Sequence, residues 1–447
     1  MLPIILVCLT AADTVAPDLS WVRARMAELR VPGLAVAAVV DGKVAWTRAF
    51  GVANRLTRDP AQESTVWPVA SLGKPVTAYA ALRLVQAGRL ELDAPLVQHR
   101  PAPAFLPRDS SRDAITLRHL LTHTSGLSNY LRDRTRRLRF TPGERYQYSG
   151  VGFMYLQQVL EQTTGQSFDS AMAGLVFDPL EMPSAWFGRP RIGGAAATVH
   201  AALAQVLPPG GIMLGISAIG AWILLIPVCA ITRRRWRFGL WHEIMAVLVA
   251  APVAWWLLAR LGGSVMALYF TAIAALAYLG PLLVAAAVFA ALRRASLALR
   301  LAAVGLVVAI GAGALFAGRA QPVPLPTWYS AEGNAAASLR SSIGDLARFA
   351  AELVDPALLD STTTGLLRSR AVRADSGLWW GLGIAVSGPE SEPRLIHRGS
   401  NPGVAALLVA VPTRRAAVVV VANAGHAAPL VQEVAERVLQ YFRPASR

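Results

Sequence analysis

The sequence is poor in lysine and in acidic side chains. Among 43 basic residues in a chain of 447, only Lys43 and Lys74 are lysines, so nearly every cation is an arginine. The 27 acidic residues leave a net charge of +16, which in itself suggests a nucleic-acid partner. The arginines are scattered, however, and no basic stripe interleaved with aromatic residues accompanies them. We therefore expect no nucleic-acid partner.

Cysteine is equally scarce. Cys8 and Cys229 both lie in apolar stretches, so we expect no disulfide framework, and neither cysteine has the setting of a nucleophile or a metal ligand. His119 and His123 are four residues apart on a predicted helix, but the glutamate of a zinc-binding His-Glu-x-x-His motif is missing. We interpret both histidines as structural, and we expect no metal and no other cofactor.

Apolar residues, by contrast, are in excess. They make up 54% of the chain, with a mean hydropathy of +0.43, whereas soluble domains have about 45–50%. Four runs carry no charge, and about 18 such residues are enough to cross a bilayer. These runs are residues 212–231, 244–259, 265–292 and 301–318. We interpret them as four transmembrane helices within residues 211–318; the alternative is four helices buried in a soluble core.

The arginines predict how these helices are oriented. Residues 233–237 and 293–300 join the first to the second span and the third to the fourth, and both loops are rich in arginine. The positive-inside bias places these two loops in the cytoplasm, so the segments before and after the block both face outward. An even number of spans is what allows those two segments to meet in one domain.

The two outward segments, residues 17–210 and 319–447, carry the signals of one α+β domain. Residues 34–54 predict two strands joined at Asp41-Gly42, and residues 405–425 predict two more strands around a basic turn. Strand pairs at both ends predict one antiparallel sheet that needs both termini. Residues 1–16 resemble a signal peptide without a basic start, the alternatives being a buried N-terminal strand or a misplaced start codon.

Within the first segment, Ser71-Leu72-Gly73-Lys74 suggests chemistry. At the start of a helix, Ser71 and Lys74 lie about one turn apart on the same face, close enough for the amine to reach the hydroxyl. A serine hydroxyl is a weak nucleophile until a base takes its proton. Lysine can be that base when burial lowers its pKa, whereas arginine stays protonated. This is a physical reason for Lys74 to be a lysine in a chain of arginines.

From this point the chain resembles a known family, the serine hydrolases related to class C β-lactamases and low-molecular-weight penicillin-binding proteins. Several segments agree in order: "VASLGKPVTA", "ITLRHLLTHTSGL", "TPGERYQYSGVGFMYLQQVLEQTTG", "SSIGDLARFAAEL" and "LIHRGSNPGVAALLVAVP". The resemblance implies a β-lactamase-like antiparallel sheet flanked by helices, with a helical subdomain. The transmembrane block then interrupts this fold.

The resemblance also implies roles for individual residues. Ser71 corresponds to the nucleophile, Lys74 to its base, and Tyr148 to the tyrosine of the second motif, which shuttles the proton to the leaving group. His397 and Gly399 stand in the third motif, where His397 binds the polar end of the substrate or holds the proton network. Gly399 lets the strand approach the substrate closely. The backbone N–H groups of Ser71 and Ser400 form the oxyanion hole.

One motif position departs from the family. Gly150 stands where the second motif has asparagine, and the lost amide, like the histidine of the third motif, favours an esterase over a β-lactamase or a D-alanyl-D-alanine peptidase. We expect a multi-pass protein of a bacterial cytoplasmic membrane whose extracytoplasmic domain hydrolyses ester or amide bonds of a small molecule or peptide through an acyl-serine. The lipid bilayer is its other partner. The alternative is a catalytically silent ectodomain that binds cell-wall peptide and signals.

Overall fold

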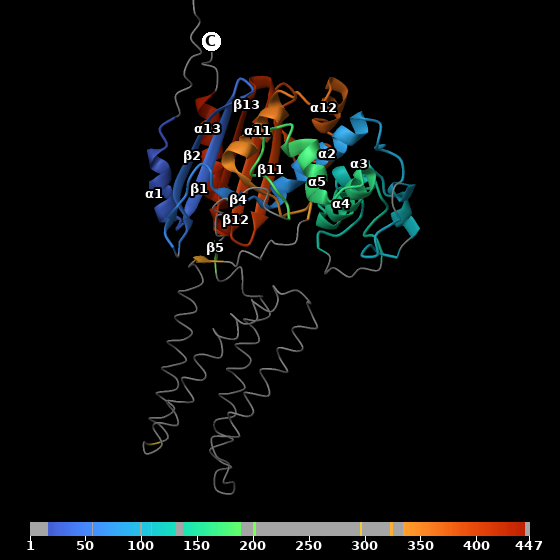
Figure 1. The fold of residues 1–447 in the computed structure, drawn as a ribbon, viewed down its shortest axis with the longest axis horizontal. Coiled ribbons are helices and arrows are strands. Elements are labelled where there is room, and N and C mark those ends of the chain that lie inside the picture. The colour runs from blue at the N-terminus through green and yellow to red at the C-terminus, as the bar shows by residue number, and fades with distance from the viewer. Residues whose placement is uncertain are drawn as a thin grey trace, which may run out of the picture. The chain divides into compact units, whose positions relative to one another are not determined.

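A computed structural model of the chain describes residues 17–55, 57–98, 101–108, 110–130, 137–188, 200–202, 296, 322–324 and 334–442. The chain divides into two units, Met1–His200 with Pro324–Arg447, and Ala201–Val323. All the helices described below, and the large sheet, belong to the first unit (Figure 1). The predicted signal peptide, residues 1–16, lies outside the described residues.

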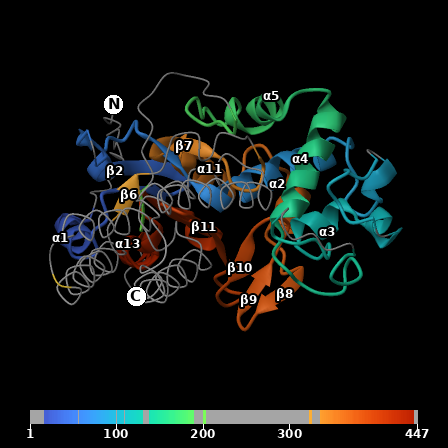
Figure 2. The ribbon, with the colours of Figure 1, turned by 90° about the horizontal axis from the view of Figure 1, so that it is seen from below.

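A nine-stranded antiparallel sheet forms the centre of the first unit, in the order β3-β2-β1-β13-β12-β11-β10-β9-β8. β1 pairs with β13, with Leu34 opposite Ala422, so the two ends of the chain meet in one sheet as predicted. Figure 2 shows β11, β10, β9 and β8 following one another toward one edge. The strands are β1 Gly33–Val40, β2 Lys43–Asn54, β3 Asp59–Pro60, β8 Val372–Asp375, β9 Leu378–Trp380, β10 Ala385–Ser387, β11 Arg394–Asn401, β12 Val404–Val411 and β13 Ala416–Ala422.

The hairpin predicted at Asp41-Gly42 joins β1 to β2. Both residues have positive φ, 52° and 76°, as the favoured two-residue hairpin turns require. The basic turn predicted between the last two strands joins β12 to β13, where Arg415 has a φ of 51°. These two local signals therefore correctly predicted two of the hairpins of the central sheet.

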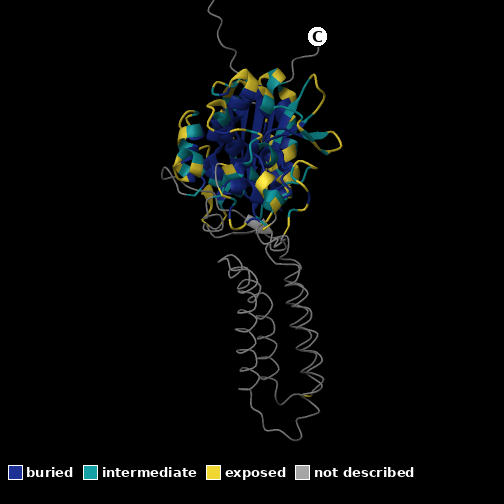
Figure 3. Ribbon diagram, turned by 90° about the vertical axis from the view of Figure 1, so that its right-hand side faces the viewer, coloured by how far each residue is buried: buried dark blue, intermediate teal, exposed yellow. Residues whose placement is uncertain are grey.

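The sheet is covered by helices on both faces, because its central strands are apolar on both sides (Figure 3). One face packs against α1 and α13, and alternate residues of the same strands pack on the other face against α11, in a hydrophobic core that extends to α2 and α4. The helices are α1 Ser20–Glu28, α2 Gly73–Gln86, α3 Leu117–Leu121, α4 Gly150–Thr164, α5 Phe168–Met172, α11 Ile343–Val354, α12 Ser361–Leu367 and α13 Ala428–Tyr441. This is the α+β arrangement that the sequence predicts.

Two short strand pairs join distant parts of the chain. β4 Val66–Pro68 pairs with β7 Arg340–Ser342, which brings the segment before Ser71 next to the segment before α11. β5 His200–Ala202 pairs with β6 Pro322–Pro324. Within the described part of the chain no helix has the length and apolar character needed to cross a bilayer. The four predicted spans lie outside the described residues, and of the loop predicted between the last two spans only Ser296 is described.

Candidate active site

Ser71 lies at a bend between β4 and α2. It is the middle residue of a short 3₁₀ turn, η1 Ala70–Leu72, that leads directly into α2. Ala70 has a φ of 49°, a left-handed conformation that a residue with a Cβ seldom adopts. β11 passes so close that a Cβ at Gly399 would lie 2.2 Å from the Val69 carbonyl oxygen. Gly399 thus allows β11 to approach the backbone just before Ser71.

Lys74 lies one turn further along, in the first turn of α2. Its Nζ is 3.1 Å from Ser71 Oγ and donates a 2.6 Å hydrogen bond to the Ala336 carbonyl. The side chain is only 2% exposed, and this burial lowers the pKa of Lys74 to about 7. Near neutral pH a large share of the amines is therefore unprotonated, which is the state a base for Ser71 needs.

Tyr148 lies on the other side of Ser71, two residues before α4. Its hydroxyl makes a hydrogen bond with Ser71, and Lys74 Nζ lies 4.8 Å from the centre of its ring. Burial raises the pKa of Tyr148 well above its usual value, with the Ser71 hydrogen bond acting in the opposite direction. The phenol is therefore neutral at physiological pH, so it can relay a proton but is not the resident base.

His123 holds the backbone on both sides of Tyr148. Gln147 N–H donates to the His123 carbonyl at 2.8 Å, and Ser149 N–H donates to His123 Nδ1 at 3.1 Å. The fully buried imidazole ring lies 4.3 Å from the Tyr148 ring, centre to centre. His123 comes after the end of α3 with a φ of 58°, so it is not on the predicted helix.

His119 has a purely local role in the capping of α3. Its backbone N–H donates to Thr116 Oγ1, and Thr116 N–H donates to His119 Nδ1, which closes a capping box. Among the residues that the structure describes, no group of three or more His, Cys, Asp or Glu is arranged to hold a metal ion.

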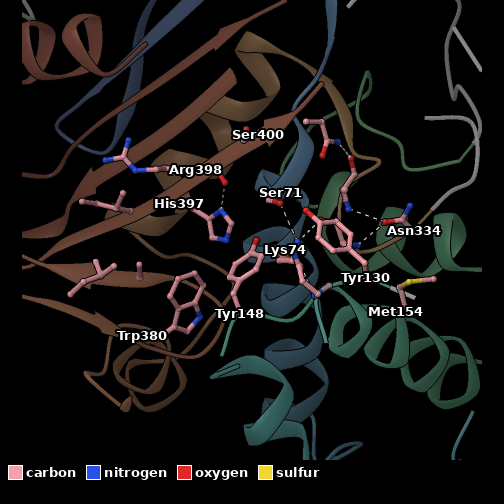
Figure 4. A pocket seen from close by; sticks show the side chains of 18 residues that line it. Ser71, Lys74, Tyr130, Tyr148, Met154, Asn334, Trp380, His397, Arg398 and Ser400 are labelled. Carbon is pink, nitrogen blue, oxygen red and sulfur yellow. Dashed lines mark hydrogen bonds between the residues drawn. The ribbon is translucent and has the colours of Figure 1, made fainter. Parts of the chain in front are cut away.

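β11 forms the wall opposite α4. His397 is 3% exposed, and burial lowers its pKa to about 3, so the imidazole stays neutral. Its Nδ1 lies 3.0 Å from the Arg398 carbonyl. Arg398 itself points away from Lys74 in Figure 4, and its Nη1 donates to Gln432 of α13 at 2.8 Å. The third motif therefore supplies no positive charge beside Ser71.

Gly150 is required by the loop that packs against it. A Cβ at this position would lie 2.5 Å from the Asn129 carbonyl oxygen, closer than such atoms come in proteins. Gly150 N–H also donates to Asn129 Oδ1 at 2.9 Å. The second motif therefore has no asparagine at position 150, but the side chain of another asparagine, Asn129, lies against the same turn.

These groups surround one cavity of about 590 Å³ (Figure 4). Five of the six residues predicted for the site line this cavity. The sixth, Gly399, does not line it and packs against the backbone of Val69. The lining is Ser71, Lys74, Asn129, Tyr130, Tyr148, Gly150, Met154, Asn334, Ala336, Ala337, Leu378, Trp380, Ala385, Ile396, His397, Arg398, Ser400 and Asn401. The structure thus brings Ser71, Lys74 and Tyr148 into direct contact and places His397 and Ser400 on the same cavity.

Four contributors to this site were not predicted from the sequence. The Ala336 carbonyl binds Lys74 across a sequence separation of 262 residues, and Asn334 shapes that turn by accepting hydrogen bonds from Ala336 N–H and Ala337 N–H. Trp380 packs its ring 4.8 Å from His123. Asn129 lies just after "HTSGL", a segment that resembles the family. That position was the one sequence signal that could have indicated a place for Asn129 at the site.

The fold and this Ser-x-x-Lys site define a class, the β-lactamase-like serine hydrolases. The family model described as β-lactamase matches residues 20–226 and 285–442, which is more than half of the chain. The chain therefore belongs to the β-lactamase family.

Curated relatives match over part of their length. Esterase EstB of Burkholderia gladioli is 37% identical over 191 residues, 36% of this chain and 48% of the esterase. The human mitochondrial serine β-lactamase-like protein LACTB is 34% identical over 106 residues, 24% of this chain and 19% of that protein. The chain thus spans about half, or less, of the length of the curated relatives it matches.

Solved structures agree on the fold. A penicillin-binding protein of Bacillus halodurans superposes with a TM-score of 0.58 at 19% identity, covering 93% of this chain and 98% of that one. The D-amino acid amidase of Ochrobactrum anthropi SV3 gives a TM-score of 0.58 at 15% identity, covering 94% and 96%. At such identities the similarity shows a common fold.

Proposed function

We propose that this protein hydrolyses ester or amide bonds of a small molecule or peptide through an acyl-Ser71 intermediate. The observation that carries the proposal is the pair formed by Ser71 and Lys74, with Nζ 3.1 Å from Oγ and the Lys74 pKa lowered by burial to about 7. A buried, partly unprotonated amine at this distance is what a serine nucleophile needs.

In the first half-reaction the neutral Lys74 amine accepts the proton of the Ser71 hydroxyl while Oγ attacks the substrate carbonyl carbon. The carbonyl oxygen gains a negative charge, which we assign to the backbone N–H groups of Ser71 and Ser400. Tyr148 passes a proton from Lys74 to the leaving group as its bond to the carbonyl carbon breaks. The alcohol or amine departs and Ser71 remains acylated.

In the second half-reaction a water molecule replaces the leaving group. It loses a proton to the neutral Tyr148–Lys74 pair and attacks the acyl carbon, and the same donors hold the oxyanion. The bond to Ser71 Oγ then breaks, Oγ regains its proton, and the carboxylic acid leaves. The Ala336 carbonyl keeps the Lys74 amine in place through both halves.

Ester hydrolysis is the variant that the site supports best. His397 is neutral, and a Cβ at position 150 would clash with the Asn129 carbonyl oxygen. Both features depart from the motifs of β-lactamases, and the 37% identical relative is an esterase by name. The histidine of the third motif also resembles that of the peptidase branch, so a D-aminopeptidase is the second activity to test. Asn129 also places a side-chain amide on the cavity wall next to Gly150. The absence of the motif asparagine, which was the support for a silent binding domain, is therefore offset by a nearby amide.

The test compares the wild type with Ser71→Ala, using 4-nitrophenyl butyrate as substrate and a fluorophosphonate as active-site label. We expect turnover and labelling in the wild type and neither in Ser71→Ala. Ser376→Ala, which alters an exposed serine outside the cavity, should behave as the wild type. Equal labelling of Ser71→Ala would refute the assignment, and an unlabelled, inactive wild type would favour the silent ectodomain.

We also propose that residues 211–318 anchor the protein in a bacterial cytoplasmic membrane, with the catalytic domain outside the cytoplasm. The four uncharged runs support this proposal. The paired strands β5 and β6 flank this block in the sequence. Fluorophosphonate-labelled protein should stay with membranes washed in alkaline carbonate and be digested by protease added to spheroplasts. Labelled protein released by carbonate, or protected from protease, would contradict the proposal.

A further inference from the structure

Asn129 is held at the cavity with one half of its amide free. Its Oδ1 accepts a hydrogen bond from Gly150 N–H at 2.9 Å, which identifies the other atom as the Nδ2 donor. Among the described residues no hydrogen bond uses that Nδ2, although the side chain lines the cavity and is partly exposed. Because Gly150 has no Cβ, the loop carrying Asn129 can come this close. The turn thus presents a fixed, neutral donor to whatever fills the cavity.

The rest of the cavity offers little to a charged substrate. No carboxylate is found among the described residues that line it. Lys74 is engaged by Ser71 and Ala336. His397 is buried and neutral. The exposed Arg398 keeps its positive charge, because its Nη1 donates to the uncharged amide of Gln432, but it points away from Lys74 (Figure 4). A substrate carboxylate close to Ser71 would therefore lose its hydration with no guanidinium of the described residues beside it, and that loss is costly in free energy.

We propose that Asn129 is a specificity-determining residue whose Nδ2 binds a neutral hydrogen-bond acceptor, such as the carbonyl oxygen of an amide or ketone, on an uncharged substrate. This inference rests on the proposed function, since it assigns the substrate class of the same site. It predicts a preference for acyl compounds that carry a second, uncharged carbonyl group over those that carry an alkyl group or a carboxylate.

Substituted phenylboronic acids test this preference without knowledge of the natural substrate. Ser71 Oγ forms a bond to boron and its proton passes to Lys74, so no co-reactant is needed. The acetyl and trifluoromethyl derivatives are similar in size and electron withdrawal, but only acetyl is a good acceptor, whereas the carboxy derivative is an anion. Inhibition constants against 4-nitrophenyl butyrate are measured for each at the 3- and 4-positions of the ring. One well-placed hydrogen bond should favour acetyl over trifluoromethyl by about tenfold, with carboxy weakest.

Asn129→Asp sharpens the test, because aspartate keeps an oxygen for Gly150 N–H and replaces only the donor. We expect the acetyl preference to disappear in Asn129→Asp. It should persist in Asn401→Asp, which adds the same charge to the same cavity at a residue whose Nδ2 donates to Ala337 O at 3.4 Å.

Equal inhibition by acetyl and trifluoromethyl derivatives in the wild type, strongest inhibition by the carboxy derivative, or an unchanged preference in Asn129→Asp would each overturn the inference. The wild-type measurement decides by itself if Asn129→Asp does not fold. Absence of inhibition by any boronate, in a preparation that hydrolyses the ester, would also overturn it. A preparation that neither hydrolyses the ester nor labels at Ser71 would instead contradict the proposed function.

Discussion

The two walls of the cavity differ in how closely they follow the family pattern. The wall built by η1 and α2 carries Ser71 and Lys74 in the expected order, packed and hydrogen-bonded. The wall built by the turn before α4 and by β11 keeps Tyr148 but carries Gly150 and His397 where related enzymes have other residues. In the proposed mechanism, proton transfer therefore depends on residues that match the family motifs, and substrate recognition on residues that do not.

This difference indicates that one part of the site can change while the other is retained. Lys74 must be buried to be a base, and its depressed pKa depends on packing around α2. The facing wall needs only to present groups that suit the substrate. The third motif has the neutral His397 where β-lactamases have a lysine, and the amide of Asn129 lies where the motif has an amide at position 150. Both changes leave the Ser71–Lys74 pair intact. Substitutions on the two walls should consequently have different effects.

The largest effect is expected at Lys74. Lys74→Met keeps the length and burial of the side chain but removes the base, and Lys74→Arg keeps a cation that does not give up its proton. Each should lower kcat for 4-nitrophenyl butyrate by about 10³-fold, within the range of general acid–base catalysis. Circular dichroism provides the check that both variants are folded. Wild-type turnover by folded Lys74→Arg would contradict the role of the amine as base.

A smaller but distinct effect is expected at Gly150. Gly150→Asn restores the residue of the family motif, yet its Cβ would press on the Asn129 carbonyl oxygen. We expect a loss of about 1–3 kcal/mol in the free energy of unfolding and no gain of nitrocefin hydrolysis. Gly174→Asn is the matched control, because a Cβ there meets nothing within 4 Å. A stable, nitrocefin-hydrolysing Gly150→Asn would show that the two walls are not independent in this way.

The smallest effect is expected at His123, which acts on catalysis only through Tyr148. His123→Ala removes the acceptor for Ser149 N–H, whereas His123→Asn retains an acceptor and tolerates the positive φ. We expect kcat to fall about tenfold in His123→Ala, with KM little changed and partial recovery in His123→Asn. In a Tyr148→Phe background His123→Ala should add almost nothing to the loss. Full additivity of the two losses in kcat would rule out this positioning role.

The sheet and the nucleophile pair could be predicted because their signals are local. Asp41-Gly42 specifies a hairpin within two residues, and a spacing of three on a helix is enough to bring Lys74 to Ser71. The pairing of β1 with β13 followed from strand signals at both ends of the chain.

The rest of the site depends on contacts between distant segments. Lys74 donates to the carbonyl of Ala336, and a backbone carbonyl leaves no signal in the sequence because every residue has one. Gly150 appears in the sequence only as the absence of the motif asparagine, whereas the structure shows Asn129 packed against it. The resemblance assigns His397 to the polar end of the substrate or to the proton network and leaves its protonation state open. Only its burial, which lowers its pKa, shows that it is neutral. The four predicted spans stay a prediction, since they fall outside the described residues.

The central claim, that Lys74 is the base for Ser71, is tested most directly by the pH dependence of Ser71 labelling. The rate constant for fluorophosphonate labelling should rise with pH and reach half its maximum at about pH 7, as Lys74 loses its proton. Tyr148 and His397 do not titrate in this range, because the pKa of Tyr148 is raised and that of His397 is about 3. A rate constant that is independent of pH from about 5 to 9, or an unchanged pH profile in Lys74→Met, would contradict the account.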